Sequence, residues 1–207
     1  LRRYLHAYLL CGGLPRPIEN LQTRGSIPAV VYKEFVDLVV GDAVAWFGPA
    51  ANRILKDISR VLTDILATPK GKDRIAGSVG VSKPRLENYL AFMERAYIIM
   101  RVRHAAIKGN GSLKRTRGAA PKYYFLDPFI FHALRAWVYQ LKPFEAANQF
   151  ISTPEVSKLV ECVVCDHLTR LAFQIKPTAL YDATRNIFHW RGKKHEVDFI
   201  LKMNGEY

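Results

Sequence analysis

Apolar residues recur at helical spacing through most of the chain. The longest such runs predict helices over residues 2–10, 27–44, 52–67 and 154–173. Shorter helices are predicted at residues 74–79 and from Asp127-Pro128 onward, and residues 143–153 are predicted to be a linker. Strand patterns occupy residues 98–102, 123–126, 179–183, 187–190 and 196–201. The hydrophobic pattern therefore predicts a mixed α+β protein.

The most informative stretch runs from residue 81 to residue 127. Ser82 is a good helix N-cap, and Pro84 is tolerated in a first helical turn. The apolar residues that follow recur at helical spacing and predict one buried face; they are Leu86, Tyr89, Leu90 and Met93. Gly80 supplies the tight turn after the preceding short helix. Two strands with a basic tip follow, and this order predicts a winged helix-turn-helix.

Charge adds a candidate partner to this picture. The 207 residues carry a net charge of +13, with a pI near 9.8, which favours polyanionic partners. No Asp or Glu occurs in residues 95–126, where Lys and Arg are concentrated. We therefore predict contact with nucleic acid, as double-stranded DNA. The predicted contact residues are Lys83, Arg85, Asn88, Arg101, Arg103, Lys108, Lys114, Arg115, Arg117 and Lys122. The alternative is a protein-docking winged helix with a solvated basic loop.

Other features limit the location and the chemistry. No apolar run approaches the roughly 20 residues of a bilayer-spanning helix, and no secretory signal is recognisable. Sparse cysteines favour a cytoplasmic protein. Cys162 and Cys165 form a C-x-x-C motif, and a zinc site would also need Cys11, His167 or His195 as ligands. The two cysteines lie within a helical pattern, however, and this favours core positions for both. No phosphate-binding P-loop is present.

The last strand pattern contains a candidate acidic site. Glu196 and Asp198 are two residues apart, so they share one face of a strand. With Glu161 from the long helix they could bind Mg²⁺ in a phosphodiesterase site. In the alternative interpretation, Glu196 pairs with Arg191 or Lys193, and Asp198 caps a neighbouring loop. Spacing alone favours this alternative, because two acids on a strand are a weak signal.

Several short motifs occur in a characteristic order at residues 12–15, 81–82, 88–99, 121–127, 159–161 and 195–200. In this order the chain resembles the C-terminal half of a family of predicted bacterial and archaeal AAA-type ATPases. The resemblance implies an ATP-binding core before residue 1, then a winged helix, then a restriction-endonuclease-like fold. Residues 1–24 would end the ATPase or lid region, 25–126 would form the helical and winged-helix domain, and 127–207 would form a truncated nuclease-like module.

The resemblance also assigns roles to single residues. Glu161, Glu196 and Asp198 would be the acidic positions of the nuclease-like site, with Glu161 and Asp198 as Mg²⁺ ligands. The acid-x-Lys strand expected next is absent from the sequence, so the catalytic site would be incomplete in this chain. Gly41 stands before Asp42 where the family leads us to expect a basic residue, which leaves the role of Asp42 open.

Three functional hypotheses follow. The leading one is a DNA-associated region of an AAA-type ATPase whose nuclease-like fold is inactive in this chain. The second is a non-enzymatic module that docks a protein, such as a toxin–antitoxin or defence component. The third is a metal-dependent nuclease in the longer protein. No membrane association is expected, and the sequence gives no oligomeric state.

Overall fold

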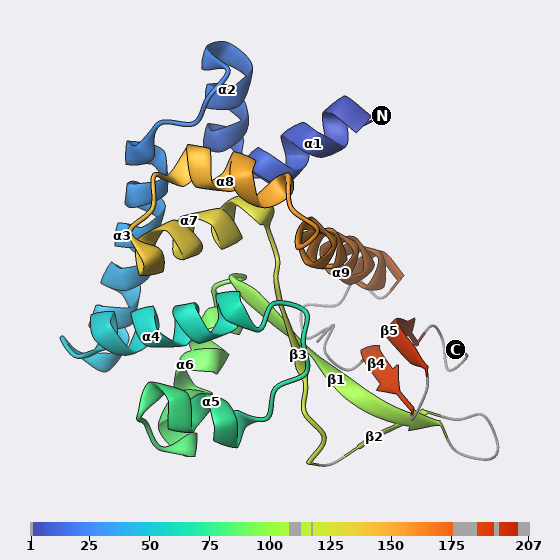
Figure 1. Cartoon of the computed structure of the whole chain (residues 1–207). Coiled ribbons are helices and arrows are strands. Elements are labelled where there is room, and N and C mark those ends of the chain that lie inside the picture. Colours follow the sequence, from blue (N-terminus) through green and yellow to red (C-terminus); the bar gives the residue numbers. More distant parts are fainter. Residues whose placement is uncertain (1, 108–112, 117, 176–185, 193–194, 203–207) are drawn as a thin grey trace.

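The computed structural model describes residues 2–107, 113–116, 118–175, 186–192 and 195–202 (Figure 1). Its helices are α1 (Arg2–Cys11), α2 (Pro15–Arg24), α3 (Ala29–Phe47), α4 (Ala51–Asp64), α5 (Lys72–Val79), α6 (Lys83–Arg95), α7 (Pro128–Tyr139), α8 (Pro143–Ile151) and α9 (Val156–Ile175). Its strands are β1 (Ile99–Ile107), β2 (Leu113–Arg115), β3 (Lys122–Phe125), β4 (Ile187–Arg191) and β5 (Glu196–Leu201). The mixed α+β composition is confirmed. No helix in these ranges combines the length and apolar character needed to cross a bilayer.

Two predicted helix starts are confirmed by their caps. The Ser82 hydroxyl accepts a hydrogen bond from the Arg85 backbone N–H at 3.4 Å, and α6 begins at the next residue. The Asp127 carboxylate accepts the N–H groups of Phe129 and Ile130 at the start of α7. The linker predicted at residues 143–153 is wrong, because α8 occupies most of it and begins at Pro143.

Strand β1 lies at the centre of the sheet formed by the described strands. Its first half pairs antiparallel with β3 from Ile99 to Val102, and its end pairs antiparallel with β2. On its other edge it pairs in parallel with β4, which continues to β5. Strands predicted at residues 187–190 and 196–201 are confirmed, whereas residues 179–183 lie outside the described part. The β1–β4 pairing crosses the domain boundary predicted at residue 126.

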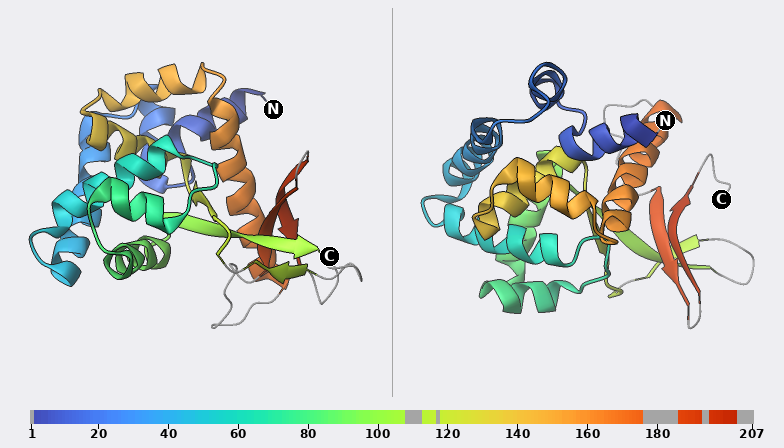
Figure 2. Two further views of the ribbon diagram at one scale, coloured as in Figure 1. Left: turned by 60° about the horizontal axis from the view of Figure 1, so that its bottom comes forward. Right: turned by 45° about the horizontal axis from the view of Figure 1, so that its top comes forward.

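Helices cover both faces of the first half of β1 (Figure 2). The Met100 side chain meets α9, where the Thr169 hydroxyl is 3.0 Å from its sulfur. The next side chain, Arg101, points the other way and contacts α6. This alternation follows from the period of two residues in a strand. All four residues of β3 are buried, because β3 lies beside this double-covered part of β1.

The helical part forms around α4. This helix buries one complete stripe, which includes Ile54, Leu55, Ile58 and Leu62, against α3, α5 and α7. Aromatic pairs connect these helices to their neighbours, as where Phe47 of α3 stacks on Tyr89 of α6. The same cluster of buried residues continues from Leu9 in α1 to Ile187 in β4. The helices and the sheet therefore share one hydrophobic core.

The glycine pair after α1 and Asp127 before α7 lie far apart in the chain but meet in this core. The Asp127 carboxylate accepts the Gly13 backbone N–H at 2.7 Å and packs against Gly12. Gly12 has a φ of +62°, and a Cβ there would lie 1.9 Å from the Asp127 Oδ1. Only glycine adopts this positive φ readily and also leaves room for the carboxylate. Burial raises the pKa of Asp127, partly offset by its backbone hydrogen bonds to Gly13, Phe129 and Ile130. These motifs therefore fix the contact between α1 and the start of α7.

Candidate functional site

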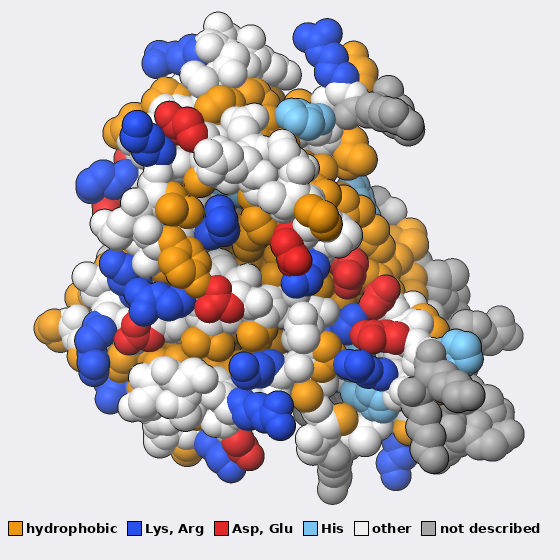
Figure 3. Space-filling view, in the orientation of Figure 1, with side chains coloured by type: hydrophobic (Ala, Val, Ile, Leu, Met, Phe, Trp, Pro, Cys, Tyr) orange, Lys and Arg blue, Asp and Glu red, His pale blue; other side chains and the backbone are white. Residues whose placement is uncertain are grey.

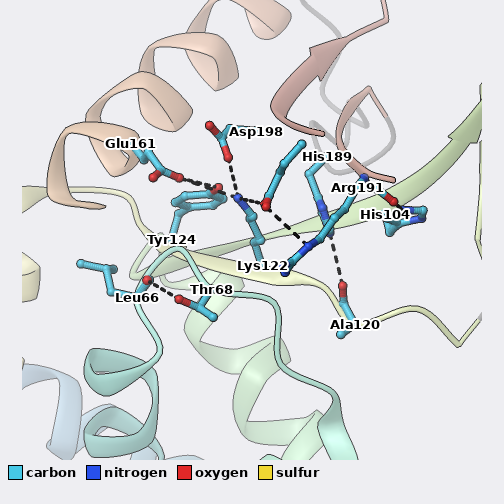
Figure 4. A network of polar contacts seen from close by, with 11 residues as sticks. Leu66, Thr68, His104, Ala120, Lys122, Tyr124, Glu161, His189, Arg191 and Asp198 are labelled. Atoms are coloured by element: carbon cyan, nitrogen blue, oxygen red, sulfur yellow. Dashed lines mark hydrogen bonds and ion pairs between the residues drawn. The ribbon is translucent and has the colours of Figure 1, made fainter. Parts of the chain in front are cut away.

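The three predicted acidic residues converge on one buried lysine. Figure 4 labels this lysine, Lys122, together with two of the acids, Glu161 and Asp198. The Lys122 Nζ lies 2.6 Å from a carboxylate oxygen of Glu196 and 2.6 Å from one of Asp198. It also lies 3.9 Å from the nearest oxygen of Glu161. The lysine side chain is only 3% exposed, whereas the three carboxylates are 29–49% exposed. The lysine thus forms the floor of the cluster, and the carboxylates form its solvent-facing rim.

Three elements bring these side chains together. Lys122 and Tyr124 alternate with Tyr123 along β3, so both face α9. Glu161 extends from α9 toward them, and the Tyr124 hydroxyl donates to it at 3.2 Å. Glu196 and Asp198 share one face of β5, as the spacing predicts. In the space-filling view, acidic side chains gather where α9 approaches β5 (Figure 3).

The electrostatics of the cluster favour a charged lysine. Burial lowers the pKa of Lys122, but its hydrogen bonds to Asp198 and Glu196 outweigh this effect and raise the pKa above its ordinary value. Burial, together with the nearby Asp198, raises the pKa of Glu161. Burial and the charge of Glu161 also raise the pKa of Tyr124. At neutral pH the cluster is therefore an ammonium ion shared by acidic neighbours, beside a neutral phenol.

The resemblance implies a Mg²⁺ site at these carboxylates, and this site stays a prediction. A divalent cation requires several oxygen ligands around a single point. Here the Lys122 ammonium lies at the point where the carboxylates converge. Within the described ranges, no group of three or more His, Cys, Asp or Glu residues is arranged to hold a metal ion. Glu161 and Asp198 are ion-pair partners of Lys122, with Asp198 in direct hydrogen-bond contact.

The alternative interpretation of the acids is correct in one part. The Arg191 Nε lies 3.7 Å from a Glu196 oxygen, so Glu196 has the predicted arginine neighbour. Lys193, the other predicted partner, lies outside the described residues. Asp198 contacts Lys122 rather than capping a loop. Lys122 as the shared partner was not anticipated, because its predicted role was contact with DNA.

Two histidines that the sequence did not single out border the cluster. His104 and His189 are partners in the parallel β1–β4 pairing, and their ring centroids are 5.2 Å apart. The His189 Nε2 donates to the Ala120 carbonyl oxygen at 3.2 Å. Burial, followed by the charges of His104 and Lys122, lowers the pKa of His189 to about 4. This histidine is therefore neutral at physiological pH and adds no cation to the site.

A second buried cation lies on the opposite face of β1. The Arg101 side chain is 6% exposed and joins Glu87 and Glu94 of α6. Its Nε lies 2.7 Å from one Glu94 oxygen, and its Nη2 contacts the other, which makes a bidentate pair. Its Nη1 lies 2.6 Å from Glu87. Hydrogen bonds to these carboxylates raise the pKa of Arg101 despite its burial.

These ion pairs correct two of the predicted nucleic-acid contacts. Arg101 and Lys122 are both turned inward and bound to the protein's own carboxylates, so they are not part of an exposed basic surface. A count of charges along the sequence could not reveal this. One signal was present, however: both residues lie between apolar neighbours in short strands. In strands covered on both faces, such positions are buried.

The other predicted contacts have different surroundings. Arg85, Asn88 and Lys114 are exposed. Lys83 is exposed as well and pairs with Asp73 at 2.7 Å. Arg103 is partly buried. Lys108, Arg117 and the side chain of Arg115 lie outside the described part of the chain, so their predicted contacts stay predictions.

The C-x-x-C pair belongs to the core. Cys162 and Cys165 are buried in α9, and both are free thiols. Burial raises the pKa of each thiol well above its ordinary value. The Cys165 sulfur contacts the Met100 sulfur at 3.8 Å. Both cysteines therefore occupy the core positions that the helical pattern favours.

Residues 2–142 match the family described as "Domain of unknown function (DUF8612)". The chain belongs to this family. The DUF8612 segment contains α1 to α7 and the β1–β3 hairpin, including Lys122 and Arg101. The three carboxylates around Lys122 lie beyond it. The description of DUF8612 mentions no ATPase, so the resemblance to AAA-type ATPases remains a prediction. No curated protein and no solved structure matches the chain.

Proposed function

We propose that this chain binds double-stranded nucleic acid through the outward face of α6 and the adjoining β1–β3 hairpin, in the manner of a winged helix. The order α4, α5, α6, β1 and β3 supports this proposal, as does the Ser82 cap that begins α6. In the same proposal the chain is a DNA-associated region of an AAA-type ATPase, and the α9–β4–β5 part is a nuclease-like fold.

The observation that carries the proposal is the separation of charges on α6. Both acidic residues of this helix, Glu87 and Glu94, lie on the flank that faces β1, where Arg101 binds them. The side turned to solvent carries Arg85, Asn88 and Arg95, all of which are exposed. Guanidinium groups on an exposed helix face are suited to phosphate oxygens and to guanine edges.

The experiment is fluorescence anisotropy with a labelled DNA duplex of mixed sequence. The double variant Arg85→Ala/Arg95→Ala should bind at least about tenfold more weakly than the wild type at low salt, because two phosphate contacts are lost. The matched control Arg24→Ala/Lys142→Ala removes the same charge from α2 and from the loop before α8, and should change affinity by less than about twofold. Equal losses of affinity in both variants would show that binding depends only on net charge, and would contradict the proposal.

A second candidate function, protein docking, is favoured by a different observation. Leu38 and Trp46 on α3 are 63% and 70% exposed, respectively. They lie about two turns apart on the same helix, and large exposed apolar side chains along one element are a feature of protein-binding surfaces. If the chain docks a protein, Leu38→Ser/Trp46→Ser should abolish stoichiometric co-purification of that partner from nuclease-treated extract. The same variant should leave duplex binding unchanged if α6 alone contacts DNA.

A further inference from the structure

The charge separation on α6 depends on a residue that does not itself face solvent. Glu87 and Glu94 are seven residues apart, which is about two helical turns, so one partner can reach both. Arg101 extends from the neighbouring strand and contacts both carboxylates. The Lys72 ammonium adds a third contact, 2.6 Å from the second oxygen of Glu87. Hydrogen bonds and charges from Lys72 and Arg101 outweigh burial and lower the pKa of Glu87, which keeps it ionised.

This flank is open to the surface that the proposed winged helix would present. A cavity of about 310 Å³ lies beside Arg101, between the start of α5 and the hairpin. The charged residues that line it are Lys72, Asp73, Arg101 and Arg103, and Asp73 pairs with Lys83. Glu87 is itself 38% exposed. A polyanion that approached α6 and the hairpin together would therefore experience the charges of Glu87 and Glu94 if nothing neutralised them.

We propose that Arg101 is a positioning residue that, together with Lys72, neutralises Glu87 and Glu94, and thereby keeps the nucleic-acid-facing surface of α6 and the hairpin positive. This inference rests on the proposed function. Arg101 does not contact the nucleic acid. It acts as an internal counter-ion, and its bidentate pair with Glu94 and single bond to Glu87 also hold the two carboxylates on the inner flank of the helix.

Three variants separate this role from a purely structural one. Arg101→Gln removes the cation that the two carboxylates share, so that Glu94 loses its partner and Glu87 keeps only Lys72 near the bound duplex. We expect its affinity at low salt to fall about five- to tenfold through Coulomb repulsion across a partly solvated surface. Arg101→Lys keeps the positive charge without the fork, and its affinity should stay within about threefold of the wild type. Circular dichroism on each variant checks that the fold is retained.

The decisive variant is the triple replacement Arg101→Gln/Glu87→Gln/Glu94→Gln. It removes the bidentate clamp together with the charges that the clamp neutralises. If Arg101 acts through charge, the triple variant should bind the duplex at least as tightly as the wild type. If Arg101 only holds α6 in place, the triple variant should bind as weakly as Arg101→Gln or more weakly. If Arg101→Gln alone fails to fold, the comparison of the triple variant with the wild type still decides between the two roles.

The outcomes also distinguish this inference from the proposed function. If the wild type shows no salt-dependent duplex binding, the proposed function fails. If the wild type binds and Arg85→Ala/Arg95→Ala weakens binding, but a folded triple variant binds more than about threefold more weakly than the wild type, the proposed function stands and the role of Arg101 is overturned.

Discussion

Replacement of Lys122 by methionine tests whether the ammonium ion organises the carboxylate cluster. Methionine keeps most of the volume of the side chain and removes the charge. The replacement leaves Glu161, Glu196 and Asp198 facing one another without a central cation. The account therefore predicts that Lys122→Met lowers the free energy of unfolding and makes the loss depend on the remaining carboxylates.

The magnitude follows from burial and geometry. Removing one partner of a buried ion pair costs about 3–5 kcal/mol. The lysine is 3% exposed, but the carboxylates are 29–49% exposed, so water screens part of their mutual repulsion. We therefore expect a loss of about 2–3 kcal/mol in the free energy of unfolding. Urea denaturation followed by circular dichroism measures it directly.

Two companion variants make the result specific. Lys142→Met, at an exposed lysine before α8, should change the free energy of unfolding by no more than about 0.5 kcal/mol. Adding Glu196→Gln and Asp198→Asn to Lys122→Met should recover part of the loss, because the like charges are removed. A loss from Lys122→Met below about 0.5 kcal/mol, or no recovery in the triple variant, would refute the reasoning.

The same cluster makes a prediction about divalent cations. Because the Lys122 ammonium already lies between the carboxylates, millimolar Mn²⁺ should leave the midpoint of wild-type thermal unfolding unchanged. Lys122→Met frees the three carboxylates, so Mn²⁺ should stabilise this variant and partly offset its loss. Specific Mn²⁺ binding by the wild type, abolished by Asp198→Ala, would instead support the metal-dependent nuclease among the sequence-based hypotheses.

Two further predictions concern the core. Gly12→Ala should lower the free energy of unfolding by more than about 2 kcal/mol in urea denaturation, because φ is positive there and the new Cβ would overlap the Asp127 carboxylate. The control Gly41→Ala should be neutral or stabilising, because open space surrounds that site. Burial lowers the pKa of His132 to about 4 from an ordinary 6.5. Below pH 6.5 the unfolded chain therefore binds a proton that the folded chain does not, so the contribution of neutral His132 to stability is complete above pH 6.5 and is lost as the pH falls toward 4. The unfolding free energy of His132→Gln should therefore fall less than that of the wild type over this range; equal falls would contradict the assignment.

The sequence was most informative where a single residue determines a local structure. Ser82 and Asp127 begin helices because their side chains accept backbone N–H groups, and this depends only on a few neighbouring residues. The strand period likewise places Glu196 and Asp198 on one face. Their convergence with Glu161 was a hypothesis supported by the resemblance, and the geometry brings all three together around one point.

The sequence was least informative where partners are distant along the chain. Lys122 meets Asp198 across 76 positions, and no local pattern pairs them. Arg101 was interpreted as a DNA contact because its neighbours in sequence lack acids, although Glu87 and Glu94 lie beside it in space. The helices α2 and α8 were missed for a local reason. Each begins at a proline, which breaks a helix in its interior but is well suited to the first helical position.

The salt dependence of duplex binding tests the central claim most directly, because its slope counts phosphate contacts. The account predicts that the logarithm of the wild-type association constant falls linearly with the logarithm of salt concentration. For Arg85→Ala/Arg95→Ala the slope should be smaller by about 2, and for Arg24→Ala/Lys142→Ala it should be unchanged. Identical slopes for the wild type and the Arg85→Ala/Arg95→Ala variant would contradict the claim that the outward face of α6 meets the phosphate backbone.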